Sequence, residues 1–314
     1  PKKAQYQAIE IMKENFKGIS LADLCSWFGV SRQAYYQSKN GVEQDLIEQE
    51  ILLEKINDIR KDHKRLGGRK LFFKLEDFMT EHHIKMGRDA FFDLLRSNNL
   101  LVKQRKRYHI TTNSNHWMKK YPNLIKDIEP FGPNHVWVSD ITYWKTRGGH
   151  YYISFITDAY SRKIVGYHVA DTMEAVESVA ALKMAMKTLK PNSDGLIHHS
   201  DRGSQYCSSV YVKTLGKSNI AISMTQNGDP LENAIAERVN GIIKGEYLFD
   251  YEIHTLTKAK EVLKSVVNLY NEDRPHSSIS NAAPSQVHGN NTELEIKRLW
   301  KNYYQTHQVC EIVV

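Results

Sequence analysis

Cysteine is scarce in this sequence, with three in 314 residues and no two of them in a C-x-x-C pair. Disulfide-stabilised secreted folds and zinc modules need cysteines that are more numerous or more closely spaced than Cys25, Cys207 and Cys310. We therefore exclude a disulfide framework and a zinc finger, and we expect the chain to work in a reduced compartment.

Long apolar runs are also missing. No stretch reaches the roughly 18 consecutive apolar residues of a membrane-spanning helix, and the first residues show no apolar segment followed by a small-residue cleavage site. These absences disfavour membrane insertion and secretion. We expect a cytoplasmic protein with no membrane partner.

Positive charge is concentrated in the first part of the chain. Residues 1–130 contain 24 Lys and Arg against 17 Asp and Glu, whereas residues 131–314 contain 19 of each, so the whole net charge of +7 lies upstream. A basic segment joined to a neutral one suggests a nucleic-acid footprint beside a different activity. The length and the 41% hydrophobic content predict two or three globular domains.

A helix-turn-helix is predicted at the start of the basic part, within residues 1–42. Residues 19–36 show apolar positions at helical spacing around a turn at Gly29, and Ser31 can cap the second helix. An ordinary helical hairpin is the alternative. The residues expected to contact DNA from the start of the recognition helix are Arg32, Gln33 and Tyr36.

Three further segments are predicted before the chain changes character. A charged connecting helix over residues 43–62 is followed by a second helix-turn-helix-like unit over 63–102, with a break at Gly87. A basic linker over 103–133 could lie along a phosphate backbone. The DNA-contact candidates in these segments are Arg69, Arg88, Lys103, Arg105, Lys106 and Arg107.

The composition changes at His135, where strand patterns begin. The expected elements are strands at 135–144, 151–160 and 162–171, a helix at 173–189, a short strand just before Asp201, a helix at 206–217, a strand at 221–224 and a last helix carrying Glu237. This order is that of the ribonuclease H-like fold. We predict an α+β multidomain protein whose catalytic core over 134–288 contains a mixed five-stranded sheet with helices, followed by a tail over 289–314.

The last helix has one polar stripe. Residues 229–232 have the pattern of a helix start, with an acceptor, a proline and a carboxylate in order. At about 100° per residue, four polar side chains lie within roughly 60° of one another, opposite an apolar face. These four are Asn233, Glu237, Asn240 and Lys244. A single carboxylate on such a stripe suits a metal ligand whose neighbours touch a polyanion, so Asn233, Asn240 and Lys244 are further DNA-contact candidates.

Asp140, Asp201 and Glu237 are the candidate catalytic residues and metal ligands. In the predicted fold Asp140 lies on the first strand and Asp201 just beyond the fourth, at neighbouring sites. Oxygen ligands without a thiol favour Mg²⁺ or Mn²⁺ over zinc. Two such ions can activate a water or a 3′-hydroxyl and stabilise the departing oxygen. Each carboxylate alone is equally well explained as a strand, turn or surface-helix residue, and only their joint order favours catalysis.

This order of two aspartates and a glutamate, with 35 residues between the last two, resembles the catalytic triad of DDE transposases and retroviral integrases. More widely, residues 19–288 resemble the OrfB-type transposases of the insertion-sequence-three family. The strings that carry the resemblance are LCSWFGVSRQAYY, TTNSNHW, PNHVWVSDITYW, DAYSRKIVGY, HSDRGSQY, ENAIAERVNGIIKGE and YNEDRPHSSISNAAPSQ.

The resemblance implies a DNA transposase that binds the terminal inverted repeats of an insertion sequence and catalyses metal-dependent strand cleavage and strand transfer. The three carboxylates would hold two Mg²⁺ ions, and Lys244 matches a basic position that contacts DNA near the scissile phosphate. Double-stranded DNA, at least a homodimer in the synaptic complex, a bacterial nucleoid-associated location and a possible upstream-frame (OrfA) fusion or partner are also implied. A C-terminal motif, structural or DNA-facing, is matched by Tyr270, Asn271, Arg274, Pro275 and His276.

Two other functions stay open. One is a non-catalytic DNA-binding regulator of transposition derived from such a transposase, and the other is a nuclease that cuts without joining strands. The chain also departs from the family where DPLENA, at residues 229–234, replaces the usual N-x-x-x-D-N-A, so that Glu232 stands in place of an aspartate. It lacks the His and Cys zinc module of retroviral integrases.

Overall fold

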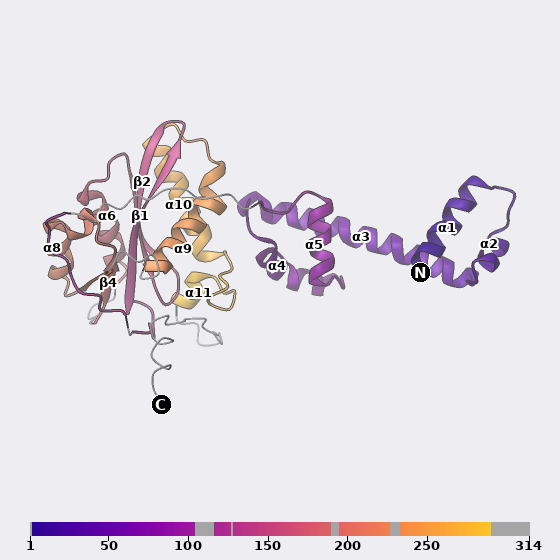
Figure 1. Ribbon diagram of the computed structural model, residues 1–314, viewed down its shortest axis with the longest axis horizontal. Coiled ribbons are helices and arrows are strands. Elements are labelled where there is room, and N and C mark those ends of the chain that lie inside the picture. Colours follow the sequence, from indigo (N-terminus) through magenta and orange to yellow (C-terminus); the bar gives the residue numbers. More distant parts are fainter. Residues whose placement is uncertain (1, 104–115, 127, 190–194, 227–232, 290–314) are drawn as a thin grey trace, which may run out of the picture. The chain divides into compact units, whose positions relative to one another are not determined.

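The computed structural model describes the whole chain except residues 1, 104–115, 127, 190–194, 227–232 and 290–314 (Figure 1). It divides into two compact units, one of Pro1–Lys61 and Leu75–Leu100 and one of Asp62–Lys74 and Leu101–Val314. The expectations for Arg105, Lys106, Arg107 and the tail from residue 290 lie outside the described residues. So does the predicted helix start at 229–232.

The first unit begins with three helices, in the region where the sequence predicts a helix-turn-helix. α1 (Lys2–Asn15), α2 (Leu21–Trp27) and the beginning of α3 (Arg32–Asp62) surround a small apolar core. Its fully buried members are Ile9, Leu24, Cys25 and Tyr35. The small side chain of Cys25 lies in this core, as expected where two helices meet.

Local signals set the ends of α2 and α3. Ser20 accepts a hydrogen bond from the backbone N–H of Asp23 at 3.2 Å, and Ser31 accepts one from Ala34 at 3.1 Å, so each serine caps a helix. Gly29 lies between the helices at φ +66°, a left-handed conformation that favours glycine. The capping role predicted for Ser31 is confirmed.

α3 is longer than the sequence pattern suggested. It continues without a break through 31 residues, so the expected recognition helix and connecting helix are one element, and the expected boundary at residue 42 falls inside it. Gly41, beside this boundary, is a residue of low helix propensity. A glycine costs about 1 kcal/mol in a helix interior, which the surrounding helix-forming residues compensate.

The second helix pair consists of α4 (Gly68–Glu81) and α5 (Arg88–Ser97), with Gly87 at the N-terminal cap of α5. α4 passes from one unit into the other at Lys74. Residues 62–74 belong with the second unit, where the side chain of His63 forms two hydrogen bonds. Its Nδ1 lies 2.9 Å from the hydroxyl of Tyr247 and its Nε2 lies 2.6 Å from a carboxylate oxygen of Asp273.

The second unit contains a five-stranded mixed sheet with strand order β3-β2-β1-β4-β5. The strands are β1 (Val136–Thr146), β2 (Gly149–Asp158), β3 (Ile164–Ala170), β4 (Ile197–Ser200) and β5 (Ala221–Met224). The first three are antiparallel neighbours, and β4 and β5 continue the sheet in parallel with β1. The predicted α+β class and ribonuclease H-like order are confirmed.

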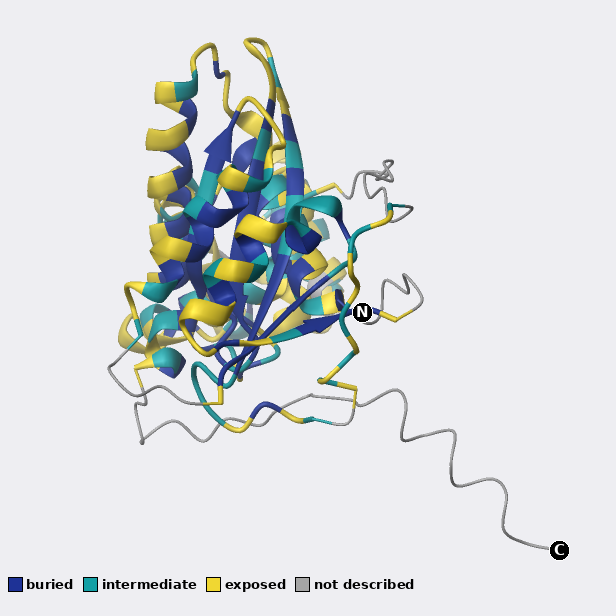
Figure 2. Cartoon of the chain, turned by 90° about the vertical axis from the view of Figure 1, so that its left-hand side faces the viewer, coloured by how far each residue is buried: buried dark blue, intermediate teal, exposed yellow. Residues whose placement is uncertain are grey.

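Helices cover both faces of this sheet, and the strands between them are mostly buried (Figure 2). α6 (Ala175–Met186) and α8 (Ser209–Lys217) pack on one face, and α9 (Ala234–Ile242) and α10 (Leu256–Glu272) pack on the other. Gly166 on β3 lets α6 approach closely, since a Cβ there would lie 2.3 Å from the carbonyl oxygen of Ala181.

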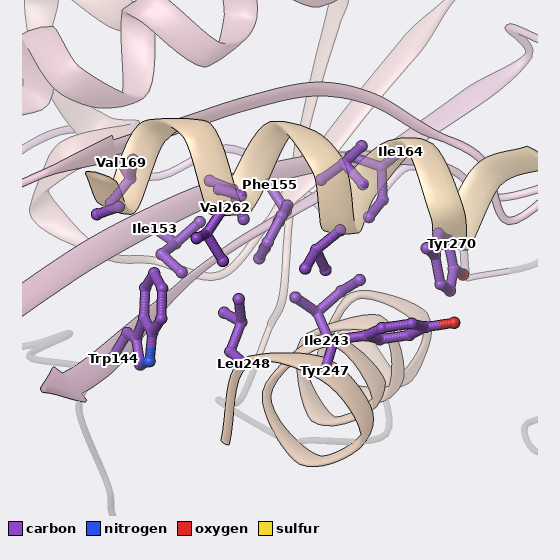
Figure 3. Close-up of a cluster of buried hydrophobic side chains, with 14 of the residues drawn as sticks. Trp144, Ile153, Phe155, Ile164, Val169, Ile243, Tyr247, Leu248, Val262 and Tyr270 are labelled. Atoms are coloured by element: carbon purple, nitrogen blue, oxygen red, sulfur yellow. The ribbon is translucent and has the colours of Figure 1, made fainter. Parts of the chain in front are cut away.

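A continuous apolar cluster joins the sheet to the helix that carries Glu237. Figure 3 shows side chains of β1 and β2 meeting those of α10 and of the segment that follows α9. That segment is a π-helix, η2 (Ile243–Tyr247), and a 3₁₀ turn, η3 (Leu248–Asp250). The labelled members include Trp144, Ile153, Phe155, Ile243, Tyr247, Leu248, Val262 and Tyr270.

Two short helices complete the described elements, α7 (Ser204–Cys207) and α11 (Pro284–His288). The sequence predicted one helix over 206–217, but the chain breaks at Ser208, whose side chain caps α8 by accepting from the N–H of Tyr211. Over the described ranges, no helix combines the length and the apolar content needed to cross a bilayer.

Candidate active site

Asp140 and Asp201 are brought together by strand pairing. β1 and β4 run in parallel with Ser139 opposite Ser200, so the residue that follows each serine lies at the same level of the sheet. Both aspartates line one hollow in the surface. The hollow is also lined by Ile141, Thr142, Tyr143, Tyr152, Met173, Gly203, Ser204, Gln205 and Tyr206.

Glu237 reaches the same region from α9. Because side chains alternate along β1, Asp140 shares the face of Val136 and Val138, against which Ala236 of α9 packs. Burial, together with the negative charges of Asp201 and Glu237, raises the pKa of Asp140 to about 7. All three carboxylates therefore interact electrostatically, with Asp140 as their common neighbour.

The carboxylates do not form a closed cluster of ligands. Within the described parts of the chain, no three His, Cys, Asp or Glu side chains are close enough together to hold a metal ion. Glu237 is exposed on its helix, whereas Asp140 and Asp201 are partly buried.

Hydrogen bonds orient the two aspartates. Asp140 accepts from the backbone N–H of Ile141 at 2.9 Å and from the side-chain amide of Asn240 at 2.7 Å, while Asp201 accepts from the N–H of Gly203 at 2.9 Å. No thiol or imidazole lines the hollow. An all-oxygen donor set of this kind fits a hard divalent cation such as Mg²⁺ or Mn²⁺.

Asn233 and Asn240 are not on the surface, contrary to the prediction that they contact DNA. Each has about 5% of its surface exposed, and Asn233 donates to the carbonyl oxygen of Ser139 at 3.0 Å. The packing of α9 against β1 covers this edge of the polar stripe. Both amides therefore connect α9 to the strand that carries Asp140, and the DNA-contact assignment is corrected to a positioning one.

Lys244 lies at the rim of the hollow. Its ammonium group is 5.2 Å from the ring centroid of Tyr143, which lines the hollow. The residue belongs to the π-helix η2 and not to the α-helix predicted from the apolar spacing. A π-helix adds a residue to the turn, so the α-helical spacing that placed Lys244 relative to Glu237 does not hold beyond Ile242.

A buried polar contact lies behind the aspartates and was not predicted. The hydroxyls of Ser139 and Tyr211 lie 2.7 and 2.9 Å from Nε2 of His198. Burial lowers the pKa of His198 to about 3, so the ring is neutral. This contact connects β1, β4 and α8 on the side of the sheet away from α9. The only sequence signal for this contact is the alternation of side chains along a strand, which places His198 and Asp201 on opposite sides of the sheet.

The remaining predicted contact residues of the described chain are exposed. Arg32, Gln33 and Tyr36 lie on the outside of α3, beside the buried Tyr35. Arg69 is exposed on α4, Arg88 pairs with Asp89 on α5, and Lys103 is exposed while its carbonyl accepts a bond from Arg65. Exposure leaves each of them accessible to a nucleic acid.

The C-terminal motif is structural. Asn271 bonds to both the N–H and the carbonyl of Ile164, and the hydroxyl of Tyr270 donates to the carbonyl of Arg162. Arg274 is fully buried and forms two hydrogen bonds of 2.7 Å with Glu246. These contacts attach α10 to the edge strand β3 and the turn after α10 to the π-helix, so these three side chains of the motif bond within the fold.

The chain matches known families over most of its length. The family profile described as Integrase core domain matches residues 131–230, and a second profile of the same description matches residues 218–284. The chain is 35% identical over 265 residues to the Insertion element IS600 uncharacterized 31 kDa protein of Shigella sonnei, covering 83% of this chain and 96% of that protein.

The chain is also similar to a second relative and, in part, to a solved structure. The chain is 31% identical over 204 residues to Transposase InsF for insertion sequence IS3A of Escherichia coli (strain K12), covering 63% of this chain and 69% of the relative. A solved structure of the HTLV-2 integrase catalytic core domain in complex with magnesium is 22% identical, with a TM-score of 0.40, covering 51% of this chain and 99% of that one.

The fold and these matches define a polynucleotidyl transferase with an integrase core domain. More narrowly, the chain belongs to the insertion-sequence-three family of DNA transposases, within the superfamily that also contains the retroviral integrases.

The raised pKa of Asp140 predicts a pH-dependent stability in the absence of divalent ions. The folded pKa of about 7 lies above the ordinary value of 3.8, so the folded state binds the proton more tightly. The stabilisation is therefore complete below about pH 4 and is lost as the pH rises through 7. Its upper limit, for a shift of about three pKa units, is about 4 kcal/mol.

Urea denaturation in EDTA at pH 5 and pH 8 measures this effect as a difference between wild type and Asp140→Asn. The comparison is needed because His198, whose pKa is lowered, changes stability with pH in the opposite direction. Asp171→Asn, at an exposed strand end, is the control and should behave as wild type. An equal pH dependence in wild type and Asp140→Asn would show that Asp140 is not the group responsible.

Proposed function

We propose that this transposase uses Asp140, Asp201 and Glu237 to hold two divalent ions, Mg²⁺ or Mn²⁺, while it cuts the ends of an insertion sequence and joins them to target DNA. The observation that carries the proposal is the pairing of β1 with β4, which brings Asp140 and Asp201 to one hollow, while α9 packs Ala236, the neighbour of Glu237, against the same face of β1. Such ions, when bound, polarise phosphate oxygens and activate a water or a 3′-hydroxyl.

The protein groups prepare the site for this chemistry. Asp140 must lose its proton to act as a ligand, and its pKa of about 7 makes that loss easy to couple to ion binding. Asn240 and the N–H of Ile141 fix the orientation of its carboxylate. Lys244, at the rim, can hold a phosphate close to the reacting bond.

The N-terminal helices supply DNA recognition in this proposal. The exposed start of α3, with Arg32, Gln33 and Tyr36, enters the major groove of the terminal inverted repeat. Arg69, Arg88 and Lys103 add phosphate contacts. At least two copies of the chain act together because two ends must be held at once, and an upstream-frame (OrfA) protein, fused or separate, contributes to end recognition.

The test incubates the purified protein with labelled element ends, target DNA and Mg²⁺. Strand-transfer products are the expected result. Cleavage without joining would favour a nuclease, and a gel shift without any chemistry would favour the non-catalytic regulator. EDTA should abolish the products, and Mn²⁺ should restore them, because oxygen ligands accept both ions.

Arg32→Ala tests the helix-turn-helix. We expect the affinity for element ends to fall roughly 5- to 100-fold and the slope of log affinity against log salt to decrease by about 1 if the guanidinium contacts a phosphate. Fluorescence anisotropy over a series of salt concentrations measures both quantities. The control is Lys13→Ala, which removes an exposed charge from α1 of the same unit. An unchanged affinity and slope in Arg32→Ala would remove this helix from the DNA interface.

A further inference from the structure

Tyr206 has a buried hydroxyl with no hydrogen-bond partner among the described residues. The residue belongs to α7, just after Asp201, and is only 3% exposed. Leaving a buried hydroxyl unpaired costs about 1–3 kcal/mol, and native proteins rarely do so without a reason. The likewise buried Tyr211 shows the usual outcome, because its hydroxyl lies 2.9 Å from His198.

The ring of Tyr206 is packed among other buried aromatic rings. It packs edge-on against Tyr211, with ring centroids 5.3 Å apart, and its centroid is 6.2 Å from that of His198. The backbone N–H of Tyr206 also bonds to the carbonyl of Gly203 at 3.0 Å. The position of the hydroxyl is therefore set by the core before any ligand arrives.

Tyr206 belongs to the catalytic hollow. Tyr206 lines it together with Asp140 and Asp201. Burial raises the pKa of this phenol well above its ordinary value, and the charges of Tyr211, Asp140 and Asp201 act in the same direction. At neutral pH the group is a hydrogen-bond donor and not an anion.

We propose that the hydroxyl of Tyr206 donates a hydrogen bond to an oxygen that enters the hollow with the substrate or the cation. This assignment rests on the proposed function and adds a residue to it. Two sources could bring such an oxygen, a phosphate of the DNA or a water bound to the cation. In both cases the hydroxyl gains the hydrogen-bond partner that it otherwise lacks. The bond exists only when DNA or the cation is bound.

Tyr206→Phe removes the hydroxyl and keeps the ring. Since the hydroxyl has no partner in the unloaded protein, the melting temperature of the metal-free variant should equal or exceed that of wild type. The rate of strand cleavage should fall about 10- to 100-fold, as expected for one hydrogen bond to a charged group. The control is Tyr167→Phe, which removes a half-buried phenol hydroxyl from β3 and should leave the rate unchanged.

Two binding measurements, made without turnover, identify the source of the oxygen. If the partner is a cation-bound water, Tyr206→Phe should weaken Mn²⁺ binding in the absence of DNA. If it is a DNA phosphate, Mn²⁺ binding should be unchanged and the affinity for element ends in Ca²⁺ should fall. Wild-type values in both measurements, or a lowered melting temperature of the metal-free variant, would overturn the assignment.

These measurements decide on Tyr206 even if the wild-type protein neither cuts nor joins DNA. That result would refute the proposed function, since turnover is its readout. Binding of Mn²⁺ and of element ends does not depend on turnover. The two hypotheses can therefore fail separately.

Discussion

Replacing Asp201 with asparagine should abolish DNA cleavage and joining while leaving the binding of element ends intact. Asparagine has nearly the same shape, and its carbonyl oxygen can still accept the hydrogen bond from the N–H of Gly203 that Asp201 accepts at 2.9 Å. What is lost is one negative charge beside Asp140. A divalent ion contributes several kcal/mol to such a reaction, so we expect a loss of roughly 10³-fold or more.

Labelled element ends measure both properties of this variant, cleavage in Mg²⁺ and binding by gel shift. Asp171→Asn is the matched control, because it neutralises an exposed aspartate that follows β3 without lining the hollow. It should cut and join as wild type does. Cleavage at the wild-type rate by Asp201→Asn, or loss of end binding in a variant that melts normally, would remove Asp201 from the reaction.

The strand pattern predicted the elements that carry Asp140 and Asp201, and the similarity of their order to the ribonuclease H-like fold predicted that the two aspartates are neighbours. Alternating residues from His135 onward, a glycine turn and a short buried strand before Asp201 identified all five strands in the right order. Once β1 and β4 are parallel neighbours, the two aspartates follow residues that pair directly. Short-range periodicity carries this information because each strand is buried on one or both faces.

The surroundings of Glu237 were harder to predict. Helical periodicity placed Asn233 and Asn240 on the polar stripe, but whether a stripe edge is exposed depends on how α9 packs against β1, which is a tertiary contact. The π-helix from Ile243 has no signal in the apolar spacing. The reason for it is also tertiary, since it brings Glu246 to Arg274, 28 residues further along the chain.

Breaking the ion pair between Glu246 and Arg274 should cost much of the stability of the fold. The side chain of Arg274 is 1% exposed, and besides its two bonds to Glu246 it donates to the carbonyl of Pro275 at 3.1 Å. Arg274→Ala leaves a mostly buried carboxylate without its partner. Removing one member of such a pair costs about 3–5 kcal/mol, so we expect that loss in the free energy of unfolding.

A double-mutant cycle in urea separates the pair from its surroundings. Replacing both members, as in Glu246→Leu with Arg274→Met, should cost much less than either single change, because no charge is left buried without a partner. Lys258→Ala is the control. It breaks an exposed pair with Glu261 and should cost under about 1 kcal/mol. Additive single effects would mean that the two side chains contribute independently.

The same pair predicts a catalytic effect without any contact to DNA. Glu246 lies in η2, which continues the helix that carries Glu237 and which contains Lys244. If Arg274 holds η2 in place, Arg274→Ala should lower the cleavage rate under conditions where the variant is still folded, whereas the double replacement should restore part of it. A rate that stays at the wild-type value in the folded single variant would show that η2 keeps its position through the apolar cluster of Figure 3 alone.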